Sequence, residues 1–180
     1  YRSSTDKIVY SSDTTAELPS SPISVGRYSV GSTGNQTAGY IAGGFTGANS
    51  RSDMDKVTYA TDTVANLPGA PLSVARQHLG ATGNTTDGYF GGGYASAPDP
   101  QRSTVDKLTY ATDTLAETPG AALTIGKYGV GATGNRESGY FGGGIRGSDK
   151  YSTIEDPKTT PGKPKIKICQ ATLISLPKDL

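Results

Sequence analysis

A repeat of about fifty residues runs through the sequence and constrains the fold more than any other feature. Tyr40, Tyr89 and Tyr140 lie in equivalent motifs, "GYIAGG" and two copies of "GYFGGG", at intervals of 49 and 51 residues. An Asp-Lys pair recurs at the same two intervals. A period of this length is typical of an array of supersecondary units that stack on their neighbours. We therefore predict a repeated structural unit and not one large irregular core.

Each unit contains four short runs that are typical of β-strands. In the first complete unit, "RYSVGST" and "GYIAGG" precede a polar loop, and "DKVTYATD" and "TVANLP" follow it. Turn signals separate the runs, and none has a helical period of apolar residues. Four short strands with tight connections predict a four-stranded antiparallel meander. The predicted fold class is therefore all-β, and a meander every fifty or so residues is typical of a β-propeller blade.

The phase of the repeat divides the chain into half a unit and three whole ones. Residues 1–25 match only the third and fourth strands, and whole units follow at 26–74 and 75–125. A divergent last unit covers 126–180, where an enlarged loop at 151–164 precedes "KIKICQATLISLP", which overlays a third and fourth strand. Three and a half blades would leave edge strands bare. Three alternatives would cover these edges or leave them open. A longer polypeptide could supply further blades, neighbouring chains could complete the ring, or the units could stack into an open fibre.

Charge and composition exclude several classes of function. Seventeen basic and 16 acidic residues give a net charge of +1, so no overall field favours nucleic acid. No apolar run approaches the ~18 residues of a membrane span, and we expect no membrane insertion. Only 33% of the residues are hydrophobic, against ~45–50% in ordinary globular domains. The apolar surface must therefore be hidden in thin, regularly spaced layers. Cys169, the single cysteine, allows no internal disulfide.

Three positions of the unit resemble a known repeat. A basic residue opens the first strand, an aromatic residue followed by glycines ends the second, and a tyrosine lies in the third. The basic residues are Arg27, Arg76 and Lys127, and the tyrosines are Tyr10, Tyr59 and Tyr110. This pattern resembles the Kelch repeat over nearly the whole chain, which implies Kelch-like β-propeller blades in an incomplete ring. The chain departs from Kelch repeats in having no Trp in its fourth strand.

A second resemblance follows the residues of the repeat more closely. The pattern "STVDKLTYATDT" followed by "GATGN" and "GYFGGG" is similar to repeat proteins encoded by tailed viruses of marine cyanobacteria. That resemblance implies a virion or tail-associated protein, located in the extracellular particle, with other virion proteins as partners.

The glycines of "GYFGGG" have a structural explanation. Glycine adopts positive φ without strain and lets two backbones approach where a Cβ would collide. We therefore interpret the motif as part of the packing between units. "GVGATG" at 129–134 satisfies the G-x-G-x-x-G dinucleotide pattern, but a turn and a strand follow it where that site needs a helix. No cofactor is expected.

The sequence presents no catalytic or metal-binding constellation, and we predict a non-enzymatic protein. His78, the only histidine, is replaced by Ser29 and Gly129 in the neighbouring units, so we expect it to be structural or exposed. The residues of each Asp-Lys pair, such as Asp55 and Lys56, are adjacent and would point to opposite faces of a strand. They are expected to pair with neighbouring strands or to cap the turn that enters the strand. A hydrolase or lyase with carboxylates converging in a central channel remains a third hypothesis.

The loop between the second and third strands varies most between the units. The three loops are Phe45–Asp53, Tyr94–Ser103 and Ile145–Thr153. Variable loops on a repeated scaffold commonly carry recognition, although they are equally explained as tolerated surface loops. The candidate binding residues are Phe45, Arg51, Tyr94, Asp99, Arg102, Arg146, Asp149 and Lys150. We expect these loops to attach the protein to a glycan or protein of a host surface. The alternative is a docking component that contacts only other virion proteins. As further partners we expect other copies of the chain in a homo-oligomer, or additional blades of the parent chain.

Overall fold

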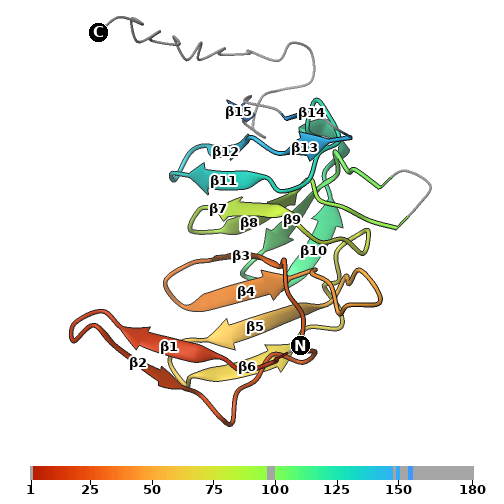
Figure 1. Cartoon of the computed structure of the whole chain (residues 1–180). Coiled ribbons are helices and arrows are strands. Elements are labelled where there is room, and N and C mark those ends of the chain that lie inside the picture. Colours follow the sequence, from red (N-terminus) through yellow and green to blue (C-terminus); the bar gives the residue numbers. More distant parts are fainter. Residues whose placement is uncertain (1, 97–99, 148, 151–153, 156–180) are drawn as a thin grey trace, which may run out of the picture.

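Antiparallel β-strands make up nearly all of the regular structure. The computed structural model describes residues 2–96, 100–147, 149–150 and 154–155 (Figure 1). Its only helical element there is the 3₁₀ turn η1 (Pro119–Ala121). The predicted all-β class is therefore confirmed. Within the described residues, no helix is long and apolar enough to cross a membrane.

Two complete four-stranded meanders form the centre of the molecule. The first contains β3 (Gly31–Gly34), β4 (Ala38–Ala42), β5 (Met54–Thr58) and β6 (Thr63–Asn66), paired in chain order. The second contains β7 (Gly80–Gly83), β8 (Asp87–Gly91), β9 (Val105–Thr109) and β10 (Thr114–Glu117), again in chain order. Their registers correspond residue for residue: Tyr40 faces Lys56 in the first and Tyr89 faces Lys107 in the second. The predicted antiparallel meander is confirmed in both.

Partial units lie at the two ends. The hairpin of β1 (Asp6–Val9) and β2 (Thr14–Glu17) has the register of a third and fourth strand. At the other end, β11 (Gly131–Gly134) and β12 (Gly139–Gly142) form a first and second strand. β13 (Ile145–Arg146) and β14 (Asp149–Lys150) form a short hairpin of their own.

The last unit differs from the sequence prediction. β15 (Ile154–Glu155) pairs with β12, so two residues of the loop expected at 151–164 form a strand. Phe141 faces Glu155 there, as Phe90 faces Asp106 in the second meander. The third strand of this unit therefore begins earlier than expected. The strands expected within residues 165–177 lie outside the described residues.

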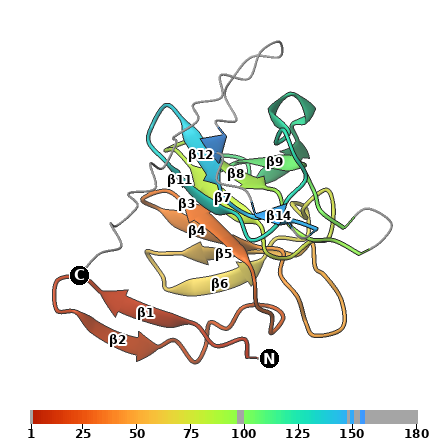
Figure 2. The same cartoon turned by 45° about the horizontal axis from the view of Figure 1, so that its top comes forward.

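The sheets stack face to face in chain order, as Figures 1 and 2 show. Contacts between the sheets concentrate on their first strands, with β3 against β7 and β7 against β11. Backbone hydrogen bonds continue along this line: the His78 N–H donates to the Ser29 carbonyl, and the Gly129 N–H donates to the His78 carbonyl. These three residues occupy the same place in successive units. The β1–β2 hairpin therefore lies at one end of the stack and β12 with β15 at the other.

The first strand of each meander begins later than the sequence predicted. Ser29 and His78 have φ of 57° and 54°, and Gly129 has 66° at the same place. A residue in this left-handed conformation cannot continue a strand. Tyr28 therefore makes only an isolated bridge to Phe45, and β3 starts at Gly31.

The glycines that follow the second strand permit close packing between units, as predicted. Gly43 has φ +68°, and a Cβ there would lie 2.6 Å from the carbonyl oxygen of Arg76 in the next unit. Gly92 repeats this arrangement with φ +67° and a distance of 2.8 Å to the carbonyl oxygen of Lys127. Both the conformation and the approach exclude a side chain.

A buried ion pair closes each meander. Arg27 Nη2 lies 2.7 Å from Asp55 Oδ2 and also donates to the carbonyl of Ile41, so it joins the segment before β3 to β4 and β5. Arg76 and Asp106 repeat the pair at 2.9 Å, and all four side chains are fully buried. Lys56 points the other way, to Asp113 of the next meander. Lys107 pairs with a neighbouring strand, as expected, since its Nζ lies 3.2 Å from Asp87 Oδ1 of β8.

Candidate binding surface

The variable loops project from one edge of the stack. Because the strands of a meander alternate in direction, the loop after every second strand emerges at the same edge. The loops between β4 and β5 and between β8 and β9, together with β13 and β14, lie at the right of Figure 1. We call this side the loop edge. The turns after the first and third strands lie at the opposite edge, which we call the turn edge.

The first loop holds Phe45 and Arg51 through local contacts. Phe45 forms backbone bridges with Tyr28 and Ser50, and its ring meets the Tyr28 ring edge-on at 5.7 Å. Arg51 pairs with Asp53 two residues away. Burial alone would raise the pKa of the Asp53 carboxyl, but Arg51 holds that pKa below its ordinary value. The cation is fixed at the surface with its charge largely satisfied by its neighbour.

The second loop presents an aromatic residue in a similar setting. Tyr94 forms bridges with Gln77 and Gln101, and its ring meets the Tyr128 ring at 5.3 Å. Arg102 acts through its backbone, since its N–H donates to the carbonyl of Gly93 and its carbonyl accepts from the Lys127 N–H. Arg102 therefore joins the second unit to the third. Asp99 lies outside the described residues.

The third loop is the β13–β14 hairpin. Arg146 is exposed there, and it pairs with Asp149 in backbone register, as Ile145 does with Lys150. Asp149 and Lys150 are therefore placed in β14, on the same edge as the other candidate residues.

The sequence analysis missed three rings that complete this surface. Tyr28, His78 and Tyr128 come just before the first strands, and they lie beside the predicted loop residues. His78 is exposed, as expected, and its ring centroid lies 6.0 Å from that of Tyr128. The signal was present in "GRYSVG", "ARQHLG" and "GKYGVG", where ring residues recur directly before the first strand. The loop edge thus carries a row of rings with arginine side chains beside it, but the rings are not gathered into one pocket.

The turn edge contains a site that the sequence did not indicate. Between the two meanders, the Tyr110 ring stacks on Tyr40 at 5.1 Å, and the Tyr110 hydroxyl lies 3.0 Å from Thr33 Oγ1. Gly83 and Gly88 leave room for that hydroxyl, since a Cβ on Gly88 would lie 2.9 Å from it. We call this arrangement the tyrosine slot. Burial is the main reason why the pKa of Tyr110 is raised.

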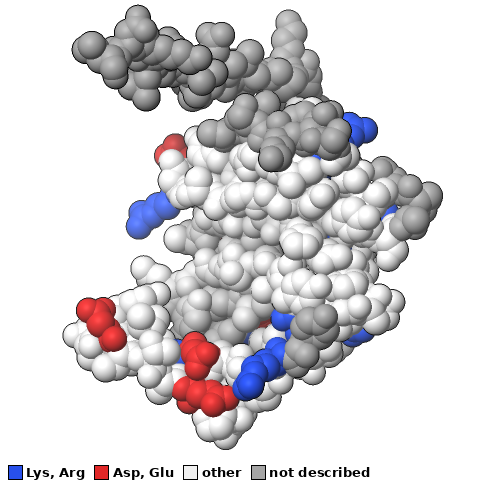
Figure 3. All heavy atoms as spheres, viewed as in Figure 1, with Lys and Arg blue, Asp and Glu red and all other residues white. Residues whose placement is uncertain are grey.

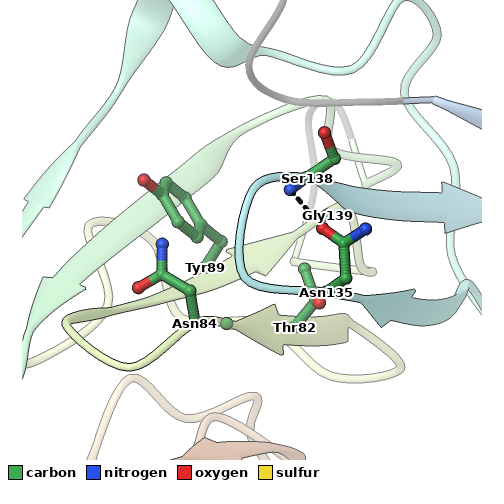
Figure 4. Close-up of a pocket in the computed structure, with 7 residues that line it drawn as sticks. Thr82, Asn84, Tyr89, Asn135, Ser138 and Gly139 are labelled. Atoms are coloured by element: carbon green, nitrogen blue, oxygen red, sulfur yellow. Dashed lines mark hydrogen bonds between the residues drawn. The ribbon is translucent and has the colours of Figure 1, made fainter.

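The next junction holds the same slot as an open pocket. Thr82 and Tyr89 take the places of Thr33 and Tyr40, and Gly139 takes the place of Gly88 (Figure 4). The pocket is also lined by Gly83, Asn84, Asn135 and Ser138. Asn135 closes the hairpin by accepting a hydrogen bond from the Ser138 N–H at 2.8 Å. The lining residues thus correspond in position to those that surround the Tyr110 ring and hydroxyl.

Charged side chains are sparse over the stacked sheets on the face shown in Figure 3. Within the described part of the chain, no group of three or more His, Cys, Asp or Glu side chains could hold a metal ion. The two surfaces that the geometry offers are therefore the ring-bearing loop edge and the tyrosine slots of the turn edge. In comparisons with known proteins, no family model and no curated protein matches the chain.

Proposed function

We propose that the chain is a non-enzymatic, tail-associated virion component whose loop edge attaches to a glycan or protein of a host surface. The row of rings and arginines on that edge carries this proposal. Tyr94 and Tyr128 offer planar apolar faces with polar tips, and Arg146 offers an exposed cation. Such side chains are enriched in recognition surfaces. The loops differ between units while the scaffold repeats, so specificity can change without a change of fold.

We further propose that the meanders are Kelch-like propeller blades. Each complete unit has four antiparallel strands in chain order, and successive units meet along their first strands. Blades of a propeller are arranged in the same way around their central axis. On this proposal, the loop edge is one face of the propeller and the turn edge is the other.

A binding experiment tests the attachment. The purified chain is screened on an immobilised glycan array and used as a competitor in virus adsorption. Replacing Arg51 and Arg146 together by Ala should weaken binding and competition about tenfold or more, because both cations lie on the loop edge. Thr85→Ala, an exposed change on the turn edge, serves as the control. No binding by the unaltered chain and no competition would contradict the attachment.

The second candidate is a docking component that contacts only other virion proteins. One observation favours it: apolar side chains of β1, including Ile8 and Val9, are exposed at the first end of the stack. Large apolar side chains left exposed at the end of a stack are typical of a protein interface. Locating the chain in the intact particle separates the two candidates, since a distal tip favours attachment and an internal interface favours docking.

A further inference from the structure

The tyrosine directly after the third strand is more exposed in units nearer the first end of the stack. Tyr110 is 7% exposed, its equivalent Tyr59 is 47% exposed, and Tyr10 is 85% exposed. The three residues share their sequence context and their place in the unit. The difference therefore reflects how much of the surrounding slot is present at each place.

At Tyr59 the glycine side of the slot is present, but no described residue takes the places of Thr33 and Tyr40. Gly39 makes room for the Tyr59 hydroxyl, since a Cβ there would lie 2.6 Å from it. Asp62 already pairs with Lys7 at 2.7 Å, as Asp113 pairs with Lys56 at 2.6 Å.

In the filled slot, the Tyr40 hydroxyl donates to Asp113 at 2.7 Å, and Thr33 meets Tyr110. The place over Tyr59 and Asp62 therefore fits a hairpin that carries a threonine and a tyrosine side by side.

At the other end of the stack, such a hairpin is uncovered. Thr133 and Tyr140 face each other across β11 and β12, as Thr33 and Tyr40 do across β3 and β4. Tyr40 is 1% exposed beneath the second meander, whereas Tyr140 is 37% exposed. Thr133 and Tyr140 are thus the kind of side chains that no described residue places over Tyr59.

Tyr10, in turn, corresponds to an open pocket at the last junction of the stack. The pocket between β7–β8 and β11–β12 has the walls of the tyrosine slot, and no tyrosine of the described residues fills it. In the described part of the chain, β1 pairs only with β2, whereas its equivalents β5 and β9 each pair on both edges. If β1 paired with β12 in the register of β4 and β5, Tyr10 directly after β1 would point into this pocket.

We propose that two copies of this chain bind head to tail, with β12 of one copy pairing with β1 of the other. The single contact fills two slots at once, because Tyr10 enters the pocket while Thr133 and Tyr140 cover Tyr59. A second copy is the partner because the two ends of the chain carry the two sides of the interface that joins the meanders. This proposal does not depend on host attachment.

The pairing of β12 with β1 of the other copy would have more residue pairs than its present pairing with β15. β12 pairs with β15 through two residue pairs, whereas β4 and β5 share five. By that register, Lys7 would face Tyr140, and Val9 would face Ser138, as Thr58 faces Ala38. β15 leaves the edge of β12 when β1 of the other copy takes its place.

Sedimentation of the full 180-residue chain over a concentration series tests the association. The unaltered chain should associate as its concentration rises. Tyr10→Ala and Tyr140→Ala should each raise the dissociation constant about tenfold or more, because each removes an aromatic anchor. Both residues are exposed, so the fold should remain, which circular dichroism verifies. Thr114→Ala, an exposed change in β10 of the second meander, should leave the association unchanged.

Cysteine cross-linking tests the register. In a Cys169→Ser background, Val9→Cys with Ser138→Cys places two thiols on facing positions of an antiparallel pair, about 4.5–5.5 Å apart between Cα atoms. β1, which ends at Val9, and β12, which directly follows Ser138, lie at opposite ends of the stack (Figure 1). An intermolecular disulfide is therefore expected. Val9→Cys with Glu137→Cys, shifted by one residue, should cross-link much less.

Three results would overturn the proposal. A chain that stays monomeric at its highest soluble concentration has no such contact. Association that survives both tyrosine changes uses another surface. Equal cross-linking of the matched and shifted cysteine pairs shows that β1 and β12 do not pair in this register.

Discussion

The two complete meanders have the same strands and the same register, but their surroundings differ. The second meander lies between neighbours on both sides, whereas the first has only the β1–β2 hairpin on its outer side (Figure 1). Features held within one meander are alike in both, as the buried pairs Arg27–Asp55 and Arg76–Asp106 show. Features shared between units differ, since Tyr110 is buried and Tyr59 is exposed.

This difference separates two contributions to the stability of the repeat, one from within each unit and one from the interfaces between units. In stacked repeats, each unit contributes its own stability and a term from each interface with a neighbour. The ion pair belongs to the unit, and the tyrosine slot belongs to the interface. Substitutions at equivalent positions of the two meanders can separate the two contributions.

The largest effect is expected from breaking the ion pair that each unit contains. Arg76→Ala leaves Asp106 as a buried, unpaired carboxylate, which costs about 3–5 kcal/mol in the free energy of unfolding. Arg27→Ala should cost a similar amount, because Asp55 is equally buried. Urea unfolding followed by circular dichroism measures both values.

Arg76→Lys is the matched control for that prediction. Lys127 occupies the same position in the third unit and is fully buried, so the unit accommodates a lysine there. Burial lowers the pKa of the Arg76 guanidinium, while Asp106 opposes the effect. Arg76→Lys should therefore cost less than Arg76→Ala. A large difference between Arg27→Ala and Arg76→Ala would contradict the assignment of the pair to the unit.

A smaller effect, and a clear inequality, is expected at the interface. Tyr110→Ala empties the slot between the meanders and should lower the free energy of unfolding by about 3 kcal/mol, near the low end for a buried aromatic residue. Tyr59→Ala should cost about 1 kcal/mol, because its ring is uncovered on one side. Dilute protein is needed for the comparison, since association would cover Tyr59. Equal costs at low concentration would mean that the slot contributes little.

The sequence predicted the parts of the structure that depend on local pattern. The strand runs, the meander and the role of the glycines follow from turn residues and from positions that exclude a side chain, such as Gly43 and Gly92. The start of the first strand was wrong because Ser29 and His78 adopt positive φ, which is uncommon for residues other than glycine. Only Gly129, at the same place in the third unit, indicated it.

The tyrosine slot could not be predicted, because its parts come from different units. Thr33, Tyr40 and Tyr110 are separated by up to 77 positions along the chain, and their proximity depends on how the sheets stack. The variable loops share one edge because the strands of a meander alternate in direction. The rings that lie beside those loops, Tyr28 and Tyr128, belong to the segments before the first strands, so a search confined to the loops missed them.

The smallest expected effect concerns the two aspartates of the turn edge. Asp113 and Asp62 both have positive φ, which asparagine also tolerates. Asp113→Asn should lower the free energy of unfolding by about 1 kcal/mol at neutral pH, because it removes the half-buried charge pair with Lys56. Asp62→Asn should cost less, because its pair with Lys7 is more exposed.

The pH dependence of the Asp113→Asn effect identifies its cause. Burial alone would raise the pKa of the Asp113 carboxyl, but hydrogen bonds from Lys56 and Tyr40 hold that pKa below its ordinary value. A lowered pKa in the folded state stabilises the protein above the unfolded value of about 3.9, and this contribution is lost as the pH falls through the folded value. The difference between the unaltered chain and Asp113→Asn should therefore be constant near neutrality and shrink below about pH 4. A difference that persists in acid would mean that the substitution acts through packing and not through charge.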